Sequence, residues 1–252
     1  MNGKKTYFVS DVHLGAPALK NNRKREKLFV SFLDQIAVDA CEIFLLGDIF
    51  DFWFEYKKVA PRGFVRTLGK IAEITDRGIP VHFFTGNHDV WVFDYLPDEI
   101  GVQVHREPMT VSINHKTFFL AHGDGLDPEE KGYLFLKRLF TNKTAQFLFT
   151  RLHPNFAFWL GHQWSMKSRI SKGLGPEKSK GIENESAVNF AKQYSDKHAI
   201  DYFIFGHRHI LLEEEIKPNV KVFILGEWIN YFSYAVFDGE KLELKKFNNI
   251  SL

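Results

Sequence analysis

Short apolar runs recur along the chain between glycine, proline and acidic residues, and most of them predict β-strands. The predicted strands are residues 7–10, 43–46, 80–85, 102–104, 109–113, 117–121, 201–205, 220–225, 231–237 and 241–246. Apolar residues at helical spacing predict helices over 23–40 and 64–72. Strand–helix–strand order at the start indicates parallel pairing, whereas the consecutive strands of the second half indicate antiparallel pairing. We therefore expect a layered α/β sandwich with one mixed sheet or two packed sheets.

Residues 125–180 break this pattern because their signal is mostly helical. Between 131 and 180 the chain has ten Lys or Arg and one acidic residue, a net charge of +9 in a chain whose formal net charge is +2. Apolar clusters at 134–136, 147–148 and 156–160 are interleaved with these cations. We interpret 125–180 as a helical insertion over the functional site, within a single domain of residues 1–252.

Composition narrows the class of protein. The single cysteine, Cys41, excludes internal disulfides and a cysteine-based zinc site, and it is typical of a reducing compartment. No apolar stretch of signal-peptide length precedes Asp11, and no run of about 18 apolar residues exists. We therefore expect a cytoplasmic protein without a membrane-spanning helix.

Polar side chains follow the strand that ends at Leu46. Gly47 permits a sharp turn, and Asp48 and Asp51 come after it. Ligands bind at this edge of an α/β sheet. Taken alone, Asp48 is as well explained as the cap of a following helix, so the interpretation depends on the other strand ends.

Five loops that follow apolar strands carry the same chemistry. They contain Asp11-x-His13, Asp48-x-x-Asp51, Asn87-His88-Asp89, His122 and His207-x-His209. A single histidine at a strand end is more often structural than a ligand, but five such loops favour one shared site.

The residue types at these loops predict a metal centre. Carboxylate, imidazole and amide oxygen suit a first-row divalent cation. Seven such side chains are too many for one ion in an open site, but they fit two ions about 3.5–4 Å apart, bridged by one carboxylate. That arrangement serves phosphoester hydrolysis, because the ions bind phosphoryl oxygens and lower the pKa of a water. The pattern therefore predicts a dinuclear phosphoesterase.

The five loops match, in order, the motifs of the calcineurin-like metallophosphoesterase superfamily, which the chain resembles from Asp11 to His209. The resemblance implies a four-layer α/β/β/α sandwich with a helical lid. It implies that His88 acts as general acid or phosphate stabiliser, oriented by Asp51, and that Asp48 bridges two ions. The implied ligands are Asp11, His13, Asp48 and His209 for one ion, and Asp48, Asn87, His122 and His207 for the other.

Within the superfamily, the chain resembles the UDP-2,3-diacylglucosamine hydrolases through Asp11-Val12-His13-Leu14-Gly15, Ala121-His122-Gly123-Asp124 and the basic, aromatic insertion. That resemblance implies Mn²⁺-dependent hydrolysis of an acylated UDP-sugar to UMP and 2,3-diacylglucosamine 1-phosphate in lipid A biosynthesis. It also implies peripheral contact with the cytoplasmic face of the inner membrane. The implied substrate contacts are Asn87, Glu130, Tyr133, Arg169 and Lys172. The chain departs from that family at His88, where the family usually has Arg, and at Asp51, where it often has Glu.

Two other classes of function compete with this interpretation. A metallophosphodiesterase or phosphatase acting on a nucleotide, a nucleic acid or a phosphoprotein would use the same metal site. The apolar clusters of the insertion favour an acylated anion or an anionic membrane over nucleic acid, unless they only pack the insertion onto the core. A non-catalytic interaction module would be expected to lose ligands, and here the set is complete. The oligomeric state is not predicted.

Overall fold

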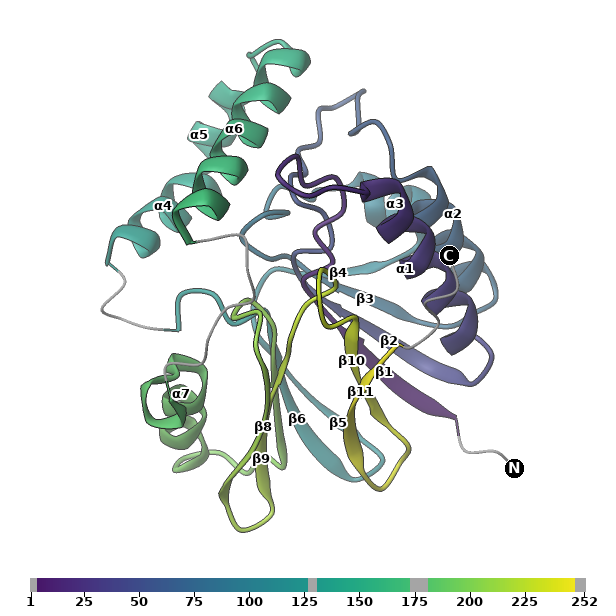
Figure 1. The fold of residues 1–252 in the computed structure, drawn as a ribbon, viewed down its shortest axis with the longest axis vertical. Coiled ribbons are helices and arrows are strands. Elements are labelled where there is room, and N and C mark those ends of the chain that lie inside the picture. Colours follow the sequence, from purple (N-terminus) through teal and green to yellow (C-terminus); the bar gives the residue numbers. More distant parts are fainter. Residues whose placement is uncertain (1–3, 127–130, 173–180, 248–252) are drawn as a thin grey trace.

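Two β-sheets stacked face to face form the centre of the molecule (Figure 1). The computed structural model describes residues 4–126, 131–172 and 181–247, without the side chains of 168–172. The first sheet has the order β11-β10-β1-β2-β3-β4 and the second the order β5-β6-β7-β9-β8. The first sheet comprises β1 (Lys5–Val9), β2 (Ala40–Leu46), β3 (Val81–Phe84), β4 (Gln103–His105), β10 (Ser233–Phe237) and β11 (Leu242–Lys246). The second comprises β5 (Met109–Ile113), β6 (Lys116–Ala121), β7 (Tyr202–Phe205), β8 (Leu211–Lys217) and β9 (Val220–Leu225).

Helices cover the outer face of each sheet, which gives four layers. Phenylalanines from both sheets fill the space between them, with Phe8 stacked on Phe44 and on Phe118. The outer face of the first sheet packs against α1 (Asn22–Ile36), α2 (Val65–Asp76) and α3 (Tyr95–Ile100). The outer face of the second packs against α7 (Ser186–Ser195), which follows the short 3-10 helix η1 (Ile182–Asn184). The predicted α/β/β/α sandwich is confirmed, and the abundance of phenylalanine is explained by its inner layer.

Strand pairing follows the prediction in the first sheet and differs from it in the second. The pairs β1–β2, β2–β3 and β3–β4 are parallel. In the second sheet β5–β6 and β8–β9 are antiparallel, but β6–β7 and β7–β9 are parallel. The prediction of antiparallel pairing is therefore confirmed for the consecutive strands β5 and β6. It was wrong for β6–β7 and β7–β9, because helices separate β6 from β7 and because β8 was not predicted. Strand β8 was not predicted because three consecutive glutamates, residues 213–215, interrupt its apolar pattern.

The insertion forms three helices at one end of the sandwich (Figure 1). They are α4 (Lys131–Thr141), α5 (Lys143–Phe149) and α6 (Pro154–Lys172). An aromatic cluster holds them to the core, in which Phe52, Phe54 and Trp91 meet ring side chains of all three helices. Within the part of the chain that is described, no helix is both long and apolar enough to cross a membrane.

Candidate active site

The five motif loops lie together at the strand ends, and their backbone is strained. Five non-glycine residues there have φ in the left-handed region, between 47° and 65°. They are Asp11, His13, Asp48, His207 and His209. Such a conformation costs about 1–3 kcal/mol per residue and persists only where the surrounding structure enforces it. These backbone conformations therefore cost the fold some stability, and they fix the directions of these five side chains.

Glycines beside these residues leave room for the carboxylates and imidazoles. A Cβ at Gly86 would lie 2.2 Å from Asp48 Oδ1, and one at Gly206 would lie 2.5 Å from Asp11 Oδ2. A Cβ at Gly47 would lie 2.6 Å from His122 Nδ1. A side chain at any of these positions would displace a group of the site.

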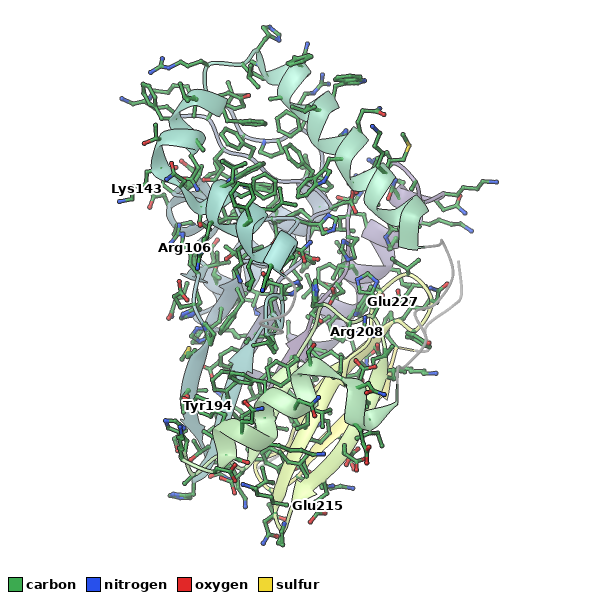
Figure 2. The ribbon with its side chains drawn as sticks, turned by 90° about the vertical axis from the view of Figure 1, so that its left-hand side faces the viewer. Arg106, Lys143, Tyr194, Arg208, Glu215 and Glu227 are labelled. Carbon is green, nitrogen blue, oxygen red and sulfur yellow. The ribbon has the colours of Figure 1, made fainter. Side chains whose placement is uncertain are left out.

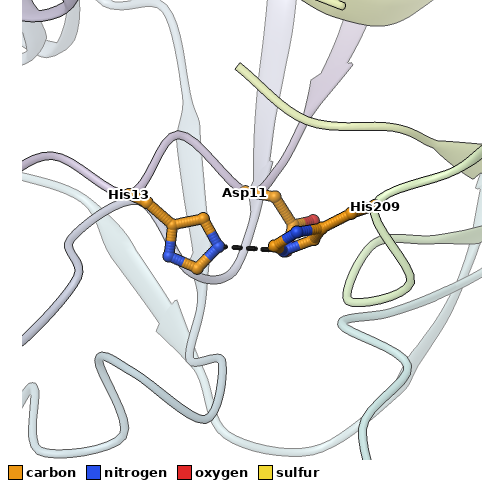
Figure 3. A group of neighbouring side chains, drawn as sticks. All are labelled: Asp11, His13 and His209. Carbon is orange, nitrogen blue, oxygen red and sulfur yellow. Dashed lines mark hydrogen bonds and ion pairs between the residues drawn. The ribbon is translucent and has the colours of Figure 1, made fainter. Parts of the chain in front are cut away.

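Asp11, His13 and His209 form the first group (Figure 3). His13 Nε2 lies 3.0 Å from His209 Nε2, and Asp11 Oδ1 lies 3.2 Å from His209 Nε2. Asp11 Oδ1 is buried and, among the described residues, accepts no hydrogen bond. Donor atoms of one six-coordinate ion stand roughly 3 Å apart when each is about 2.1 Å from it. The spacing and the unbonded oxygen fit a divalent cation.

Asp48, His122 and His207 form the second group, which Asn87 joins. Asn87 Oδ1 lies 2.9 Å from His207 Nδ1 and 3.4 Å from His122 Nε2. Asp48 Oδ2 lies 3.4 Å from His122 Nε2. These atoms again have the spacing of ligands around one ion.

Asp48 lies between the two groups. Its Oδ2 is 3.7 Å from His13 Nε2 as well as 3.4 Å from His122, and its Oδ1 accepts the His88 backbone N–H at 2.9 Å. Burial alone would raise the pKa of Asp48, but the neighbouring His122 and His88 hold it well below its usual value. The same Asp48 charge raises the pKa of His122 against the effect of burial. This position is the one a bridging carboxylate needs.

Asp89 is a buried residue of the third loop to which sequence reasoning gave no role. Its carboxylate accepts backbone N–H bonds from Gly86 at 2.7 Å and Ile49 at 2.9 Å, and weaker ones from Asp48 and Phe50. Burial and the nearby Asp48 charge raise the pKa of Asp89 to about 7. It ties the loops after β2 and β3 together. The sequence pattern Asn-His-Asp contains Asp89, but nothing in the sequence shows whether this carboxylate is a metal ligand or holds two loops together.

His88 and Asp51 are adjacent, but their contact is not the one that side-chain reasoning suggests. The His88 Nδ1–H donates to the Asp51 backbone carbonyl at 2.8 Å, whereas the Asp51 carboxylate is 3.9 Å from that nitrogen. Asp51 Oδ1 lies nearer to His13 Nδ1, at 3.5 Å, and Oδ2 accepts the Ser165 hydroxyl. Because a carbonyl only accepts, His88 Nε2 is the ring nitrogen left for a substrate.

Comparison with known proteins agrees with this geometry. The family model for the calcineurin-like phosphoesterases matches residues 4–211. The chain belongs to the calcineurin-like phosphoesterase family. The predicted resemblance is thereby confirmed, and the protein is a metal-dependent phosphoesterase whose side chains form groups able to hold divalent ions.

Three curated relatives of this calcineurin-like phosphoesterase share one name. A UDP-2,3-diacylglucosamine hydrolase of Porphyromonas gingivalis is 43% identical over 258 residues, covering 98% of both chains. Proteins of the same name from Histophilus somni and Actinobacillus succinogenes are 26% and 25% identical, covering 89% of this chain and 92% of each relative.

A cavity of about 640 Å³ opens beside the second group of this phosphoesterase. Asn87 and His122 line one part of it, and α4 and α5 line another. Arg106 and Lys143 also line it and lie on the same side of the molecule (Figure 2). Sequence reasoning gave Arg106 no role and counted Lys143 only among the cations of the insertion, because only the fold brings the residue after β4 beside the inserted helices.

The structure locates only some of the predicted substrate contacts beside the cavity. Asn87 and Tyr133 both line the cavity. The Tyr133 hydroxyl donates to Asp124, whose carboxylate also pairs with Lys137 at 2.7 Å, so α4 is attached to the His122 loop. Glu130 lies outside the described residues, as do the side chains of Arg169 and Lys172.

Proposed function

We propose that this phosphoesterase hydrolyses the pyrophosphate of UDP-2,3-diacylglucosamine, giving UMP and 2,3-diacylglucosamine 1-phosphate in lipid A biosynthesis. The observation that carries the proposal is the cavity beside the second metal-ligand group, which combines apolar walls with cations. The relatives with that name, one of them 43% identical over nearly the whole chain, support the same substrate.

The shape of the cavity suits an acylated anion. Leu134 and Phe140 give it apolar walls. Arg138 brings positive charge to the same helix, whereas the charge of Lys137 is met by the Asp124 carboxylate. A second, almost wholly apolar pocket of about 400 Å³ lies between α4 and α5 and shares Phe140 with the first. A small nucleotide or a phosphoprotein would leave this apolar volume unfilled, whereas acyl chains would bury it.

Two divalent ions are proposed as cofactors, with Mn²⁺ as the first choice for a set of oxygen and imidazole ligands. When bound, such ions neutralise phosphoryl oxygens and activate water. Asp11, His13, Asp48 and His209 would hold one ion, and Asp48, Asn87, His122 and His207 the other.

His88 has a separate proposed role. Fixed through Nδ1 by the Asp51 carbonyl, its imidazole would present Nε2 to the phosphate and stabilise the charge that develops there, or protonate the leaving group.

Exposed apolar side chains of the inserted helices support a peripheral membrane position. Large apolar side chains with at least half of their surface exposed gather on α4, α5 and α6. They are Phe135 (68%), Leu148 (62%), Phe147 (56%), Trp159 (54%) and Phe156 (50%). The Arg151 guanidinium lies 4.3 Å from the centre of the Phe147 ring. Apolar side chains beside cations suit an anionic lipid surface, so we place the enzyme at the cytoplasmic face of the inner membrane.

The test is incubation of the purified protein and Mn²⁺ with UDP-2,3-diacylglucosamine, measuring UMP release. UDP-N-acetylglucosamine, which lacks the two long acyl chains, serves as the matched substrate. We expect efficient UMP release from the acylated compound and at least 100-fold lower kcat/KM for UDP-N-acetylglucosamine. A factor of 100 corresponds to about the free energy of burying several methylene groups. Equal turnover of both, or turnover only of a small phosphodiester, would transfer the assignment to another phosphoester.

A further inference from the structure

Helix α6 of the insertion contacts the metal-ligand loops through one buried hydroxyl. The Ser165 side chain is only 3% exposed, and its Oγ–H donates to Asp51 Oδ2. Asp51 follows β2 in the core, 114 residues earlier in the chain. The contact therefore joins the inserted helices to the loop that also carries Asp48.

The other oxygen of the same carboxylate faces a proposed ligand. Asp51 Oδ1 lies 3.5 Å from His13 Nδ1, while Nε2 of the same ring faces Asp11 and His209. At 3.5 Å the carboxylate acts on Nδ1 through its charge, which favours a proton on that nitrogen and leaves Nε2 to face an ion. Asp51 is only 1% exposed, so water has little access to its carboxylate and would not readily replace the Ser165 hydroxyl as its hydrogen-bond donor.

The close approach of α6 depends on small residues one helical turn apart. Ala157, Gly161 and Ser165 are all buried and follow each other at intervals of four. A Cβ on Gly161 would lie 2.3 Å from the ring of Phe52, the residue after Asp51. Only a helix seated this closely brings the Ser165 hydroxyl to the carboxylate.

We propose that Ser165 is a positioning residue through which the seating of α6 sets the geometry of His13 at the first metal position. Ser165 fixes the Asp51 carboxylate, the carboxylate orients the His13 imidazole, and a displaced α6 weakens metal binding. The inference rests on the proposed metal site but not on the acylated substrate, so a failure to release UMP would leave it standing.

The experiment compares Ser165→Ala with the matched control Thr150→Val. The Thr150 hydroxyl also belongs to the insertion, but within the described residues it donates only to the Phe147 carbonyl. Mn²⁺ binding to metal-free protein is measured by calorimetry without substrate. Removing the residue that orients a metal ligand lowers metal affinity by about 10–100-fold. Ser165 contacts that orienting residue, Asp51, and not the ligand itself, so we expect a smaller effect, about 3- to 10-fold weaker Mn²⁺ binding at one site. Thr150→Val should bind as the unmodified protein does.

A second measurement separates positioning from general packing. In an Asp51→Asn background, where the charge behind His13 is already absent, Ser165→Ala should change Mn²⁺ affinity by less than about twofold. With a small chromogenic phosphodiester, excess Mn²⁺ should restore kcat of the single variant. Unchanged Mn²⁺ affinity in Ser165→Ala, or an equal loss in the Asp51→Asn background, would overturn the proposal.

Discussion

His122 Nδ1 lies 2.8 Å from the backbone carbonyl of Leu46, the last residue of β2. Because the carbonyl can only accept, Nδ1 carries a proton, and Nε2 is the ring nitrogen that lies 3.4 Å from both Asp48 Oδ2 and Asn87 Oδ1 in the second group. One backbone atom of the first sheet thus sets the tautomer of a side chain from the second. The site depends on the exact stacking of the two sheets, and the following predictions test its parts.

Asp48→Ala should lower kcat by at least about 100-fold, because it removes the only carboxylate that faces both ligand groups among the described residues. Bound Mn²⁺ should fall in parallel, as measured by elemental analysis after gel filtration. Glu213→Ala, which removes an exposed carboxylate paired with Lys221, is the control. Near-normal turnover of Asp48→Ala would contradict the two-ion site.

His88→Ala should lower kcat by about 10²–10⁴-fold while leaving the metal content unchanged, because its Nδ1 is engaged by the Asp51 carbonyl and Nε2 acts on the substrate. Kinetics on a small phosphodiester and metal analysis of the same sample check both halves of the statement. If the metal is lost instead, His88 is a ligand.

Arg208→Ala should destabilise the protein and loosen the loop that carries His207 and His209. Arg208 pairs with the wholly buried Glu185 through Nε at 2.9 Å and Nη2 at 3.4 Å. Loss of Arg208 takes this partner from a buried carboxylate and should cost about 2–4 kcal/mol in the free energy of unfolding. The exposed pair of Lys221 with Glu213 supplies the control, since Lys221→Ala should cost about 0–1 kcal/mol. Equal effects in urea titrations would rule out a special role for Arg208.

Replacing Phe156 and Trp159 together by serine should weaken sedimentation with anionic vesicles by at least tenfold while leaving small-substrate kinetics unchanged. Both side chains are about half exposed on α6. Val38→Ser is the matched control, because Val38 is 82% exposed but lies just after α1, away from the insertion. If the double replacement leaves vesicle binding unchanged, any membrane contact lies elsewhere on the protein.

Asp39→Asn should show a pH-dependent loss of stability at a position remote from the proposed metal site. Burial raises the pKa of Asp39, but hydrogen bonds from Lys5 at 2.7 Å and Tyr7 at 2.7 Å outweigh it and hold the pKa below the usual value. The stabilisation is therefore present above the unfolded-state pKa near 4 and is lost as the pH falls through the lower folded-state pKa. The variant should melt below the unmodified protein at pH 7, by about 1 kcal/mol, and the difference should shrink toward pH 3. A difference that grows on acidification would refute this.

The sequence by itself determined which residues gather at the site. Apolar strands followed by Asp, Asn and His are local patterns, and strand ends in such a fold meet at one edge, so Asp11, Asp48 and His122 could be brought together without coordinates. The helical character of the insertion was equally local. The parallel pairing of β1 to β4 in the first sheet followed from alternating strands and helices.

The tertiary structure alone decided how these residues are directed. The Asp51 carboxylate faces His13 and Ser165 rather than His88, and Asp89 fastens two loops. In the second sheet, parallel pairing of β7 with β6 and β9 sets where His207 lies relative to His122. These contacts join residues from 19 apart (Tyr202 and Lys221) to 114 apart (Asp51 and Ser165), and the close packing of the interior fixes them. A sequence pattern specifies which groups are available, but only the packed fold chooses which atom of each group meets which partner.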